Sequence, residues 1–291
     1  MERYALIIGA MKAGTTTLFD HLAAHPAVAP SHPKEPGFFA FDEQFSKGRD
    51  HYHSLFAFEA GEHQIRLDGS TDYAKHPYCG DIPARLRAFG GDFRLVYSLR
   101  HPLRRIESHA QHVQHKRREV GRIDSDRPDH SLDAGVSPVS MAISRYAAQL
   151  DQYADYFDRG ALLITSVERM ARAPEATMRE ACEHLGLDPA ALPANVERKN
   201  AGEQIWQGRE IHPLWRAAAA FAPARRLVRA VTPSDWRDRM RNKTRPQTEA
   251  KGRFRLTSEE ESRLIDVLAP DLRRLTDRYG FDVKGEWGID L

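Results

Sequence analysis

A short loop near the start of the chain combines residue types that bind phosphate. It runs from Gly9 through Lys12 and Gly14 into three consecutive threonines, between an apolar run and a helical stretch. Backbone N–H groups at a helix start are unpaired, and the helix dipole favours an anion there. Glycines allow close approach of a ligand, while Lys12 and the hydroxyls supply charge and donors. The alternative is an ordinary strand-to-helix turn with a capping threonine. The predicted phosphate ligands are Lys12, Ala13, Gly14, Thr15, Thr16 and Thr17.

The loop differs from the phosphate loop of nucleoside triphosphatases. That motif, Gly-x-x-x-x-Gly-Lys-[Ser/Thr], has its lysine directly after the second glycine and a hydroxyl on magnesium. Here Lys12 precedes Gly14, and Thr15 stands in the lysine position. The ammonium is therefore expected beside the first phosphate-like group rather than at a γ-phosphate. The segment Lys12-Ala13-Gly14-Thr15-Thr16 resembles the 5′-phosphosulfate loop of sulfotransferases that use 3′-phosphoadenosine 5′-phosphosulfate (PAPS).

Arg100 and Ser108 could bind a second phosphate. Arg100 follows an apolar run that predicts a strand, and Ser108 lies one to two turns into the helix predicted next. An arginine offers two parallel N–H donors to a phosphate, and a serine adds another donor. Taken alone, this arginine would be an ordinary surface residue. Beside the first loop it resembles the 3′-phosphate motif of the sulfotransferases, which implies that Arg100 and Ser108 hold the 3′-phosphate of PAPS.

Glu35 is the candidate general base. It lies between two prolines in the loop Pro33–Phe39, just before a Phe-Phe pair. A stiff, partly apolar loop makes a carboxylate a better base; the alternative is a surface Lys34–Glu35 pair on a proline turn. The loop is similar to that of heparan-sulfate N-sulfotransferases and 3-O-sulfotransferases, where a glutamate before Phe-Phe acts as the base. The similarity continues through Lys47–Tyr52 and implies that Glu35 takes the acceptor proton.

His112 follows Ser108 by four residues and shares its face of the predicted helix. The N-sulfotransferases have a catalytic histidine at the matching position, which implies a catalytic role for His112. Histidines at 109, 112 and 115 fan out around a helix, so we predict no metal site. The two cysteines match no zinc spacing and form no disulfide framework.

A basic loop, Lys251-Gly252-Arg253, directly precedes the last predicted helix. A glycine between two cations suits a phosphate, and the alternative is an exposed linker. The family has a similar loop that closes over the 3′-phosphate, which implies that Lys251, Gly252 and Arg253 bind the cofactor. The chain lacks the family's disulfide in this region and the proline usual after the loop.

The candidate residues need a sheet to position them. Continuous apolar runs of the kind found in buried parallel sheets predict strands at Tyr4–Gly9, Gln64–Gly69, Arg94–Leu99 and Ala161–Ser166. Helices are predicted at Thr16–His25, Pro102–Glu119, Val139–Phe157, Pro174–Leu185 and Ser258–Tyr279, the last with a capping sequence. The alternation predicts an α/β class, a three-layer P-loop-type fold with a central, mainly parallel sheet flanked by helices.

The composition is that of a folded protein, with 41% hydrophobic and 29% charged residues among 291. We predict a single domain over 1–291, with 197–250 as a helical insertion or lid. No apolar run is long enough for a membrane span. The chain opens on a predicted core strand, which leaves no room for a signal peptide and predicts a cytoplasmic protein.

The charge is concentrated in two segments. The net charge of the chain is +2, but 99–122 carries +5 and 221–255 carries +8. These segments suggest a bound polyanion of limited size; the alternative is solvated helix faces. The resemblance implies sulfuryl transfer from PAPS to a hydroxyl or amine of a carbohydrate or small-molecule acceptor, by in-line displacement without a metal. A P-loop kinase using ATP and magnesium and a non-catalytic polyanion-binding protein remain as alternatives. We predict no nucleic-acid partner, because no helix-turn-helix is present and aromatics do not interleave with the basic runs.

Overall fold

The structure is a computed structural model that describes residues 1–119, 136–193, 207–209, 247–249 and 254–291. The chain divides into two compact units. The first comprises Met1–Ala110, Asp129–Arg198 and Arg255–Leu291, and the second comprises Gln111–Pro128 and Lys199–Phe254. Most of the predicted insertion at 197–250 lies outside the described residues. Within it, β6 (Gln207–Arg209) and β7 (Gln247–Glu249) pair antiparallel. The single-domain organisation stays a prediction.

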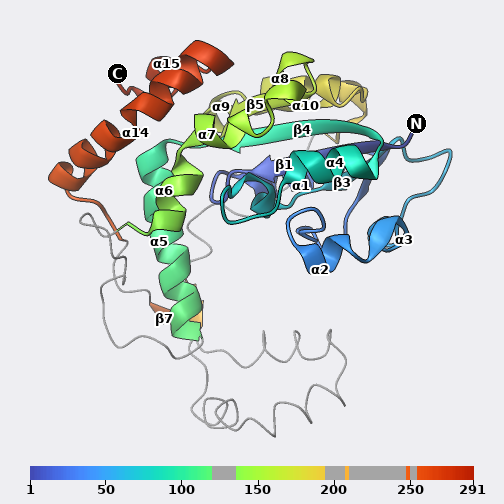
Figure 1. Ribbon diagram of the computed structural model, residues 1–291, viewed down its shortest axis with the longest axis horizontal. Helices are drawn as coiled ribbons and strands as arrows, with labels where there is room; N and C mark the ends of the chain where they lie inside the picture. Colours follow the sequence, from blue (N-terminus) through green and yellow to red (C-terminus); the bar gives the residue numbers. More distant parts are fainter. Residues whose placement is uncertain (120–135, 194–206, 210–246, 250–253) are drawn as a thin grey trace, which may run out of the picture. The chain divides into compact units, whose positions relative to one another are not determined.

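Five parallel strands form the central sheet of the first unit, in the order β2-β3-β1-β4-β5 (Figure 1). Their bounds are β1 Arg3–Gly9, β2 Val28–Pro30, β3 Ile65–Asp68, β4 Asp92–Leu99 and β5 Leu162–Ser166. All four pairings are parallel, so the carboxyl ends of the strands meet at one edge of the sheet. The four predicted strands are confirmed with bounds shifted by at most two residues. The additional strand, β2, is only three residues long.

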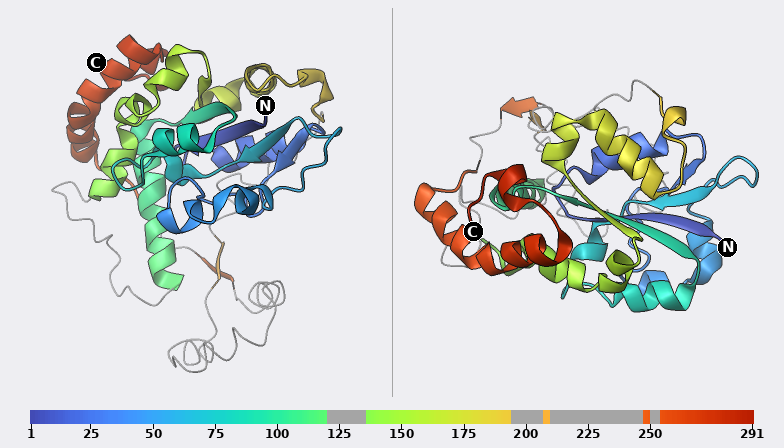
Figure 2. Two further views of the ribbon diagram at one scale, coloured as in Figure 1. Left: turned by 45° about the vertical axis from the view of Figure 1, so that its right-hand side comes forward. Right: turned by 90° about the horizontal axis from the view of Figure 1, so that it is seen from above.

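Alternate residues of β1 supply the two faces of the sheet. Ile7 packs into a cluster with Leu18 of α1 (Thr15–Ala23) and Cys182 of α10 (Pro174–His184). Tyr4 lies on the other face, where its ring stacks on Phe93 with the centroids 4.8 Å apart. This alternation follows from the two-residue period of a strand. Helices therefore cover both faces, with α1 and α10 on one and α4 on the other (Figure 2).

The remaining elements connect or cover the strands. Their bounds are α2 Asp42–Phe45, α3 Gly48–His53, η1 Thr71–Ala74, α4 Ile82–Phe89, α5 Pro102–Glu119, α9 Val167–Arg172, η2 Pro189–Ala191 and α15 Val283–Trp287. Among the described helices, none combines the length and apolarity needed to traverse a bilayer.

The prediction of one helix over Val139–Phe157 is wrong. The segment forms three short helices, α6 (Pro138–Ser144), α7 (Tyr146–Asp151) and α8 (Ala154–Asp158). The chain leaves helical geometry at Arg145, whose ψ is 79°. The Asp271 carboxylate accepts hydrogen bonds from the backbone N–H groups of Ala147 and Ala148, at 3.0 and 2.9 Å. These first-turn donors of α7 are thus satisfied by a side chain from a distant helix, which permits the break.

The last predicted helix is confirmed as α14 (Ser258–Tyr279). Thr257 and Glu260 form a capping box at its start, and Gly280 ends it in the left-handed conformation. Its buried face repeats every three or four residues, at Leu264, Leu268, Leu272 and Leu275.

Candidate functional site

The loop between β1 and α1 is bonded to the end of β4. The Ala10 N–H donates to the Ser98 carbonyl at 2.7 Å, and the Ser98 hydroxyl donates to the Ala13 carbonyl at 2.7 Å. Lys12 and Gly14 both have φ near 72°, in the left-handed region. The neighbouring strand therefore fixes the direction of the loop backbone before any ligand binds.

Helix α1 begins at Thr15, and Gly14 is its N-cap. A glycine has no side chain to bond the first N–H groups of the helix, and no capping side-chain bond is made there. The alternative of a capping threonine is therefore wrong. The start of this nine-residue helix has the donor geometry and dipole that favour an anion. Thr15 is buried, whereas Thr16 and Thr17 are half-buried.

The two glycines of the loop are explained by packing against the protein. A Cβ on Gly14 would lie 2.9 Å from Cγ2 of Val167, and one on Gly9 would lie 3.0 Å from Cβ of Ala74. These contacts give a packing reason for glycine at both positions, and close approach of a ligand to the loop stays a prediction. The positive φ of Gly14 adds a second reason for glycine at that position.

Arg100 joins the two predicted phosphate sites. Its Nη1 donates to the Lys12 carbonyl at 3.2 Å, so the guanidinium reaches the first loop from the end of β4. The Tyr146 hydroxyl donates to the Arg100 carbonyl at 2.6 Å and holds this turn in place. Ser108 is half-buried on α5, as the spacing from Pro102 predicts.

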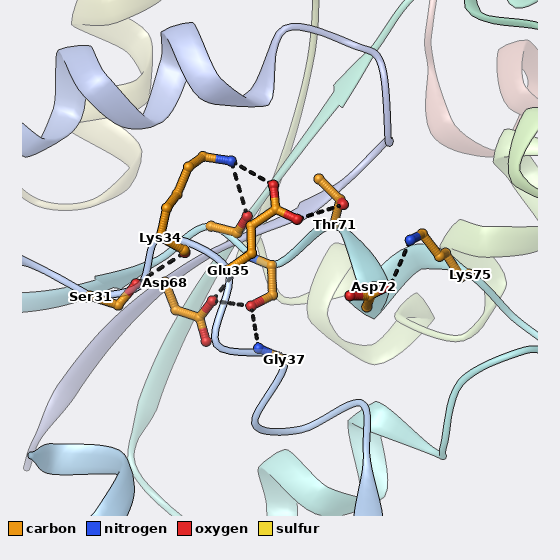
Figure 3. A network of polar contacts seen from close by, with 10 residues as sticks. Ser31, Lys34, Glu35, Gly37, Asp68, Thr71, Asp72 and Lys75 are labelled. Atoms are coloured by element: carbon orange, nitrogen blue, oxygen red, sulfur yellow. Dashed lines mark hydrogen bonds and ion pairs between the residues drawn. The ribbon is translucent and has the colours of Figure 1, made fainter. Parts of the chain in front are cut away.

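Glu35 is held between Lys34 and Thr71 (Figure 3). The Lys34 ammonium lies 2.9 Å from Oε1, and the Thr71 hydroxyl donates to Oε2 at 3.2 Å. The Glu35 side chain is 41% exposed. The prediction of partly apolar surroundings for Glu35 is therefore wrong. The alternative, a surface pair of Lys34 and Glu35, is present. The carboxylate is accessible from solvent but fixed in position at both oxygens.

The Phe-Phe pair anchors the Glu35 loop instead of surrounding its carboxylate. Phe38 and Phe39 are 1% and 0% exposed, and the Phe38 ring stacks on Tyr52 with centroids 4.5 Å apart. The Gly37 N–H donates to the Ser70 hydroxyl at 2.9 Å. Aromatic packing and this backbone bond together fix where Glu35 lies.

Sequence reasoning missed Asp68, which lies at the carboxyl end of β3 and is 0% exposed. Oδ1 accepts from the N–H and hydroxyl of Ser70, at 2.9 and 2.6 Å. Oδ2 accepts from the hydroxyls of Tyr52 and Tyr73, at 3.1 and 2.6 Å. Burial raises the pKa of Asp68 from 3.8 to about 6, although these hydrogen bonds act to lower it. Ser70 thus links a buried carboxylate to Gly37 in the Glu35 loop. The available signal was an aspartate at the end of a predicted parallel strand.

The remaining predicted site residues, His112 and the basic loop Lys251-Gly252-Arg253, stay predictions. His112 is half-buried on the part of α5 that belongs to the second unit. Lys251, Gly252 and Arg253 lie outside the described residues. Within the described ranges, no group of three or more His, Cys, Asp or Glu is arranged to hold a metal ion.

No family model matches the chain. The chain is 29% identical over 187 residues to heparan sulfate glucosamine 3-O-sulfotransferase 3A1 of Mus musculus, covering 63% of this chain and 45% of the mouse protein. It is 30% identical over 192 residues to heparan sulfate glucosamine 3-O-sulfotransferase 6 of Homo sapiens, covering 63% and 52%. The chain is a homologue of sulfotransferases. It spans about half the length of the relatives it matches.

One solved structure has a similar fold. The crystal structure of a sulfotransferase from Alicyclobacillus acidocaldarius aligns with a TM-score of 0.51 and 24% identity, over 81% of this chain and 99% of that one. At this identity the likeness establishes the fold. The resemblance to sulfotransferases and the α/β fold with a central parallel sheet are confirmed.

Proposed function

We propose that the protein is a sulfotransferase that moves a sulfuryl group from PAPS to a hydroxyl or amine of a carbohydrate or small-molecule acceptor. One observation supports this most directly. Arg100 donates to the Lys12 carbonyl at 3.2 Å, so the residues suited to two phosphate groups meet at one edge of the sheet. Glu35 is bonded to Thr71, just beyond the end of β3, at this same edge.

The donor types in the first unit suit PAPS. Lys12, Ala13, Gly14, Thr15, Thr16 and Thr17 would hold the 5′-phosphosulfate, because the start of α1 favours an anion. Arg100 and Ser108 would hold the 3′-phosphate. Lys251, Gly252 and Arg253 would close over it. Bound PAPS would supply the sulfuryl group, activated by its bond to the 5′-phosphate.

The chain's own residues would carry the proton and neutralise charge. Glu35 would take the proton from the attacking acceptor atom, with Thr71 and Lys34 keeping the carboxylate in place. Lys12 would neutralise charge developing on the 5′-phosphate oxygen, and His112 would help hold the sulfonate. Lys12 and the start of α1 would do what magnesium does in kinases, so no metal would be needed. Catalysis would then rest on positioning and charge stabilisation.

The acceptor class is proposed from the relatives. The matched proteins are named for heparan sulfate glucosamine, which favours a carbohydrate acceptor for this chain. The choice between hydroxyl and amine, and the cytoplasmic location, stay predictions.

A thermal-shift titration tests the donor. Adenosine 3′,5′-bisphosphate (PAP) and ATP with magnesium are added separately to the wild type and to Arg100→Ala. A ligand that binds only the folded state raises Tm. We expect a shift with PAP that is reduced in the variant. A shift with ATP and magnesium alone would favour the kinase alternative and contradict the proposal.

A kinetic comparison tests the catalytic residues. PAP release from PAPS is measured with heparan sulfate as acceptor. Glu35→Gln should lose turnover and keep PAP affinity, and Lys12→Ala should abolish turnover. Glu43→Gln, an exposed glutamate on α2, is the matched control and should keep the wild-type rate. A near-normal rate for Glu35→Gln would exclude it as the base.

A further inference from the structure

Arg105 is a completely buried cation on α5, with 0% exposure. Its Nε donates to the Ser144 hydroxyl at 2.9 Å. Its Nη2 lies 2.6 Å from the Ser140 carbonyl and 2.7 Å from each of the Ser140 and Ser144 hydroxyls. Nη1 is buried and has no hydrogen-bond partner among the described residues. The described groups that are bonded to this guanidinium are therefore all neutral.

No carboxylate among the described residues balances the charge of Arg105. Its electrostatic neighbours are the phenols of Tyr97 and Tyr146 and the like-charged Arg100. Burial lowers the pKa of Arg105, but a guanidinium remains protonated in proteins. A buried charge without a counter-charge is unfavourable for folding, so its presence calls for a ligand or a function.

The other arginines around α5 differ in this respect. Glu107, a buried carboxylate, lies 3.0 Å from Nη1 of Arg104 and 2.7 Å from Nη1 of Arg255. Arg104 also lies 3.4 Å from Glu261. These two arginines are thus neutralised by partners within the protein. Arg105, one residue after Arg104, has no counter-charge among the described residues and lies in a low-dielectric interior, where electrostatic effects reach further than at the surface.

Arg105 lies close to the proposed 3′-phosphate ligands. Ser108 is three residues further along the same helix, which places the two on neighbouring positions of one face. Tyr146, an electrostatic neighbour of Arg105, donates through its hydroxyl to the Arg100 carbonyl at 2.6 Å. The buried charge therefore sits behind the turn that carries Arg100.

We propose that Arg105 determines the preference for a 3′-phosphorylated nucleotide, by placing an unpaired positive charge behind the phosphate that Arg100 and Ser108 contact. The inference rests on the proposed function. Arg105 would touch no ligand atom. The two negative charges of a bound phosphate would provide the counter-charge that the described part of the protein lacks.

Binding of two nucleotides that differ only in the 3′-phosphate tests this role. The affinities for PAP and for adenosine 5′-monophosphate (AMP) are measured by calorimetry for the wild type, Arg105→Met and Arg105→Lys. We expect Arg105→Met to weaken PAP binding about tenfold, or about 1.4 kcal/mol, and to leave AMP binding nearly unchanged. Arg105→Lys, which keeps the positive charge, should retain much of the preference for PAP over AMP. If Arg105 served only to stabilise the fold, Arg105→Met would weaken the binding of both nucleotides alike.

Arg104→Met is the matched control, because it removes the same charge from an exposed and neutralised position on the same helix. It should leave the ratio of PAP to AMP affinity near the wild-type value. If Arg105→Met does not fold, Arg105→Gln gives the same comparison, since its amide can still bond the two serines. An unchanged ratio in the neutral Arg105 variant, or an equal change in Arg104→Met, overturns the inference. A wild type without preference for PAP overturns the proposed function instead.

Discussion

The buried carboxylate of Asp68 makes a specific prediction about stability and pH. Its pKa is about 6 in the folded protein, against 3.8 for an ordinary aspartate, and burial is the largest cause. The folded state therefore binds this proton more tightly than the unfolded state does. The stabilisation from this proton is full below about pH 3.8 and is lost as the pH rises through 6. A difference of roughly two pKa units corresponds to about 3 kcal/mol in total.

The substitution Asp68→Asn removes the titration and keeps the shape of the side chain. We expect the free energy of unfolding of the wild type, relative to Asp68→Asn, to fall by about 2 kcal/mol between about pH 4.5 and pH 7.5. Urea unfolding followed by tryptophan fluorescence at several pH values measures this difference. Asp42→Asn, at a side chain that is 93% exposed, is the control and should show a nearly constant difference.

Two opposing effects act on Asp68, and the experiment shows which is larger. Desolvation raises its pKa, while the four hydrogen bonds from Ser70, Tyr52 and Tyr73 lower it. If the stability of the wild type relative to Asp68→Asn stays constant or grows as the pH rises, the reasoning is refuted, because the hydrogen bonds would then equal or outweigh burial.

Three further substitutions test other contacts. Thr71→Val removes the hydroxyl bonded to Glu35 and should lower kcat about tenfold with PAP affinity unchanged, as measured by steady-state kinetics; an equal loss in Thr71→Ser would contradict this. Gly14→Ala should lower the free energy of unfolding by more than about 1 kcal/mol, because φ is 72° and the new Cβ meets α9. Gly48→Ala, with φ of 81° and nothing within 4 Å, carries the backbone cost without the contact and should be less destabilising when both variants are compared by thermal unfolding. Thr257→Ala should lower stability by about 1 kcal/mol in urea unfolding through loss of the capping box, and an unchanged value would show that the cap contributes nothing.

The helices show where local sequence suffices. The start of α14 at Ser258 was predictable because Thr257 and Glu260 bond within one turn. The break at Arg145 was not, because the carboxylate that satisfies Ala147 lies 124 positions along the chain. Helical spacing of apolar residues continues across the break, so periodicity alone gave no sign of it.

In the candidate site, too, some features were predictable from local sequence and others depended on distant segments. The positions of Lys12 and Gly14 in a loop between a strand and a helix, and of Arg100 after a strand, were predictable because strands, turns and helix starts are local features. The place of Glu35 in its loop was also predicted, but its surroundings were not. Its partner Thr71 comes from another segment, and the aromatic pair that seemed to enclose it turns into the core.

The sequence alone therefore determined four of the five strands of the central sheet, the capped helix α14, the strand-to-helix loop at Gly9–Gly14 and the family resemblance. These depend on capping, periodicity and residue types within a few positions of one another. The tertiary structure decided that Asp68 is buried, that Glu35 is exposed and paired, and that Arg105 has no counter-charge among the described residues. Burial and charge pairing depend on which distant segments pack together, and no local pattern in the chain encodes that.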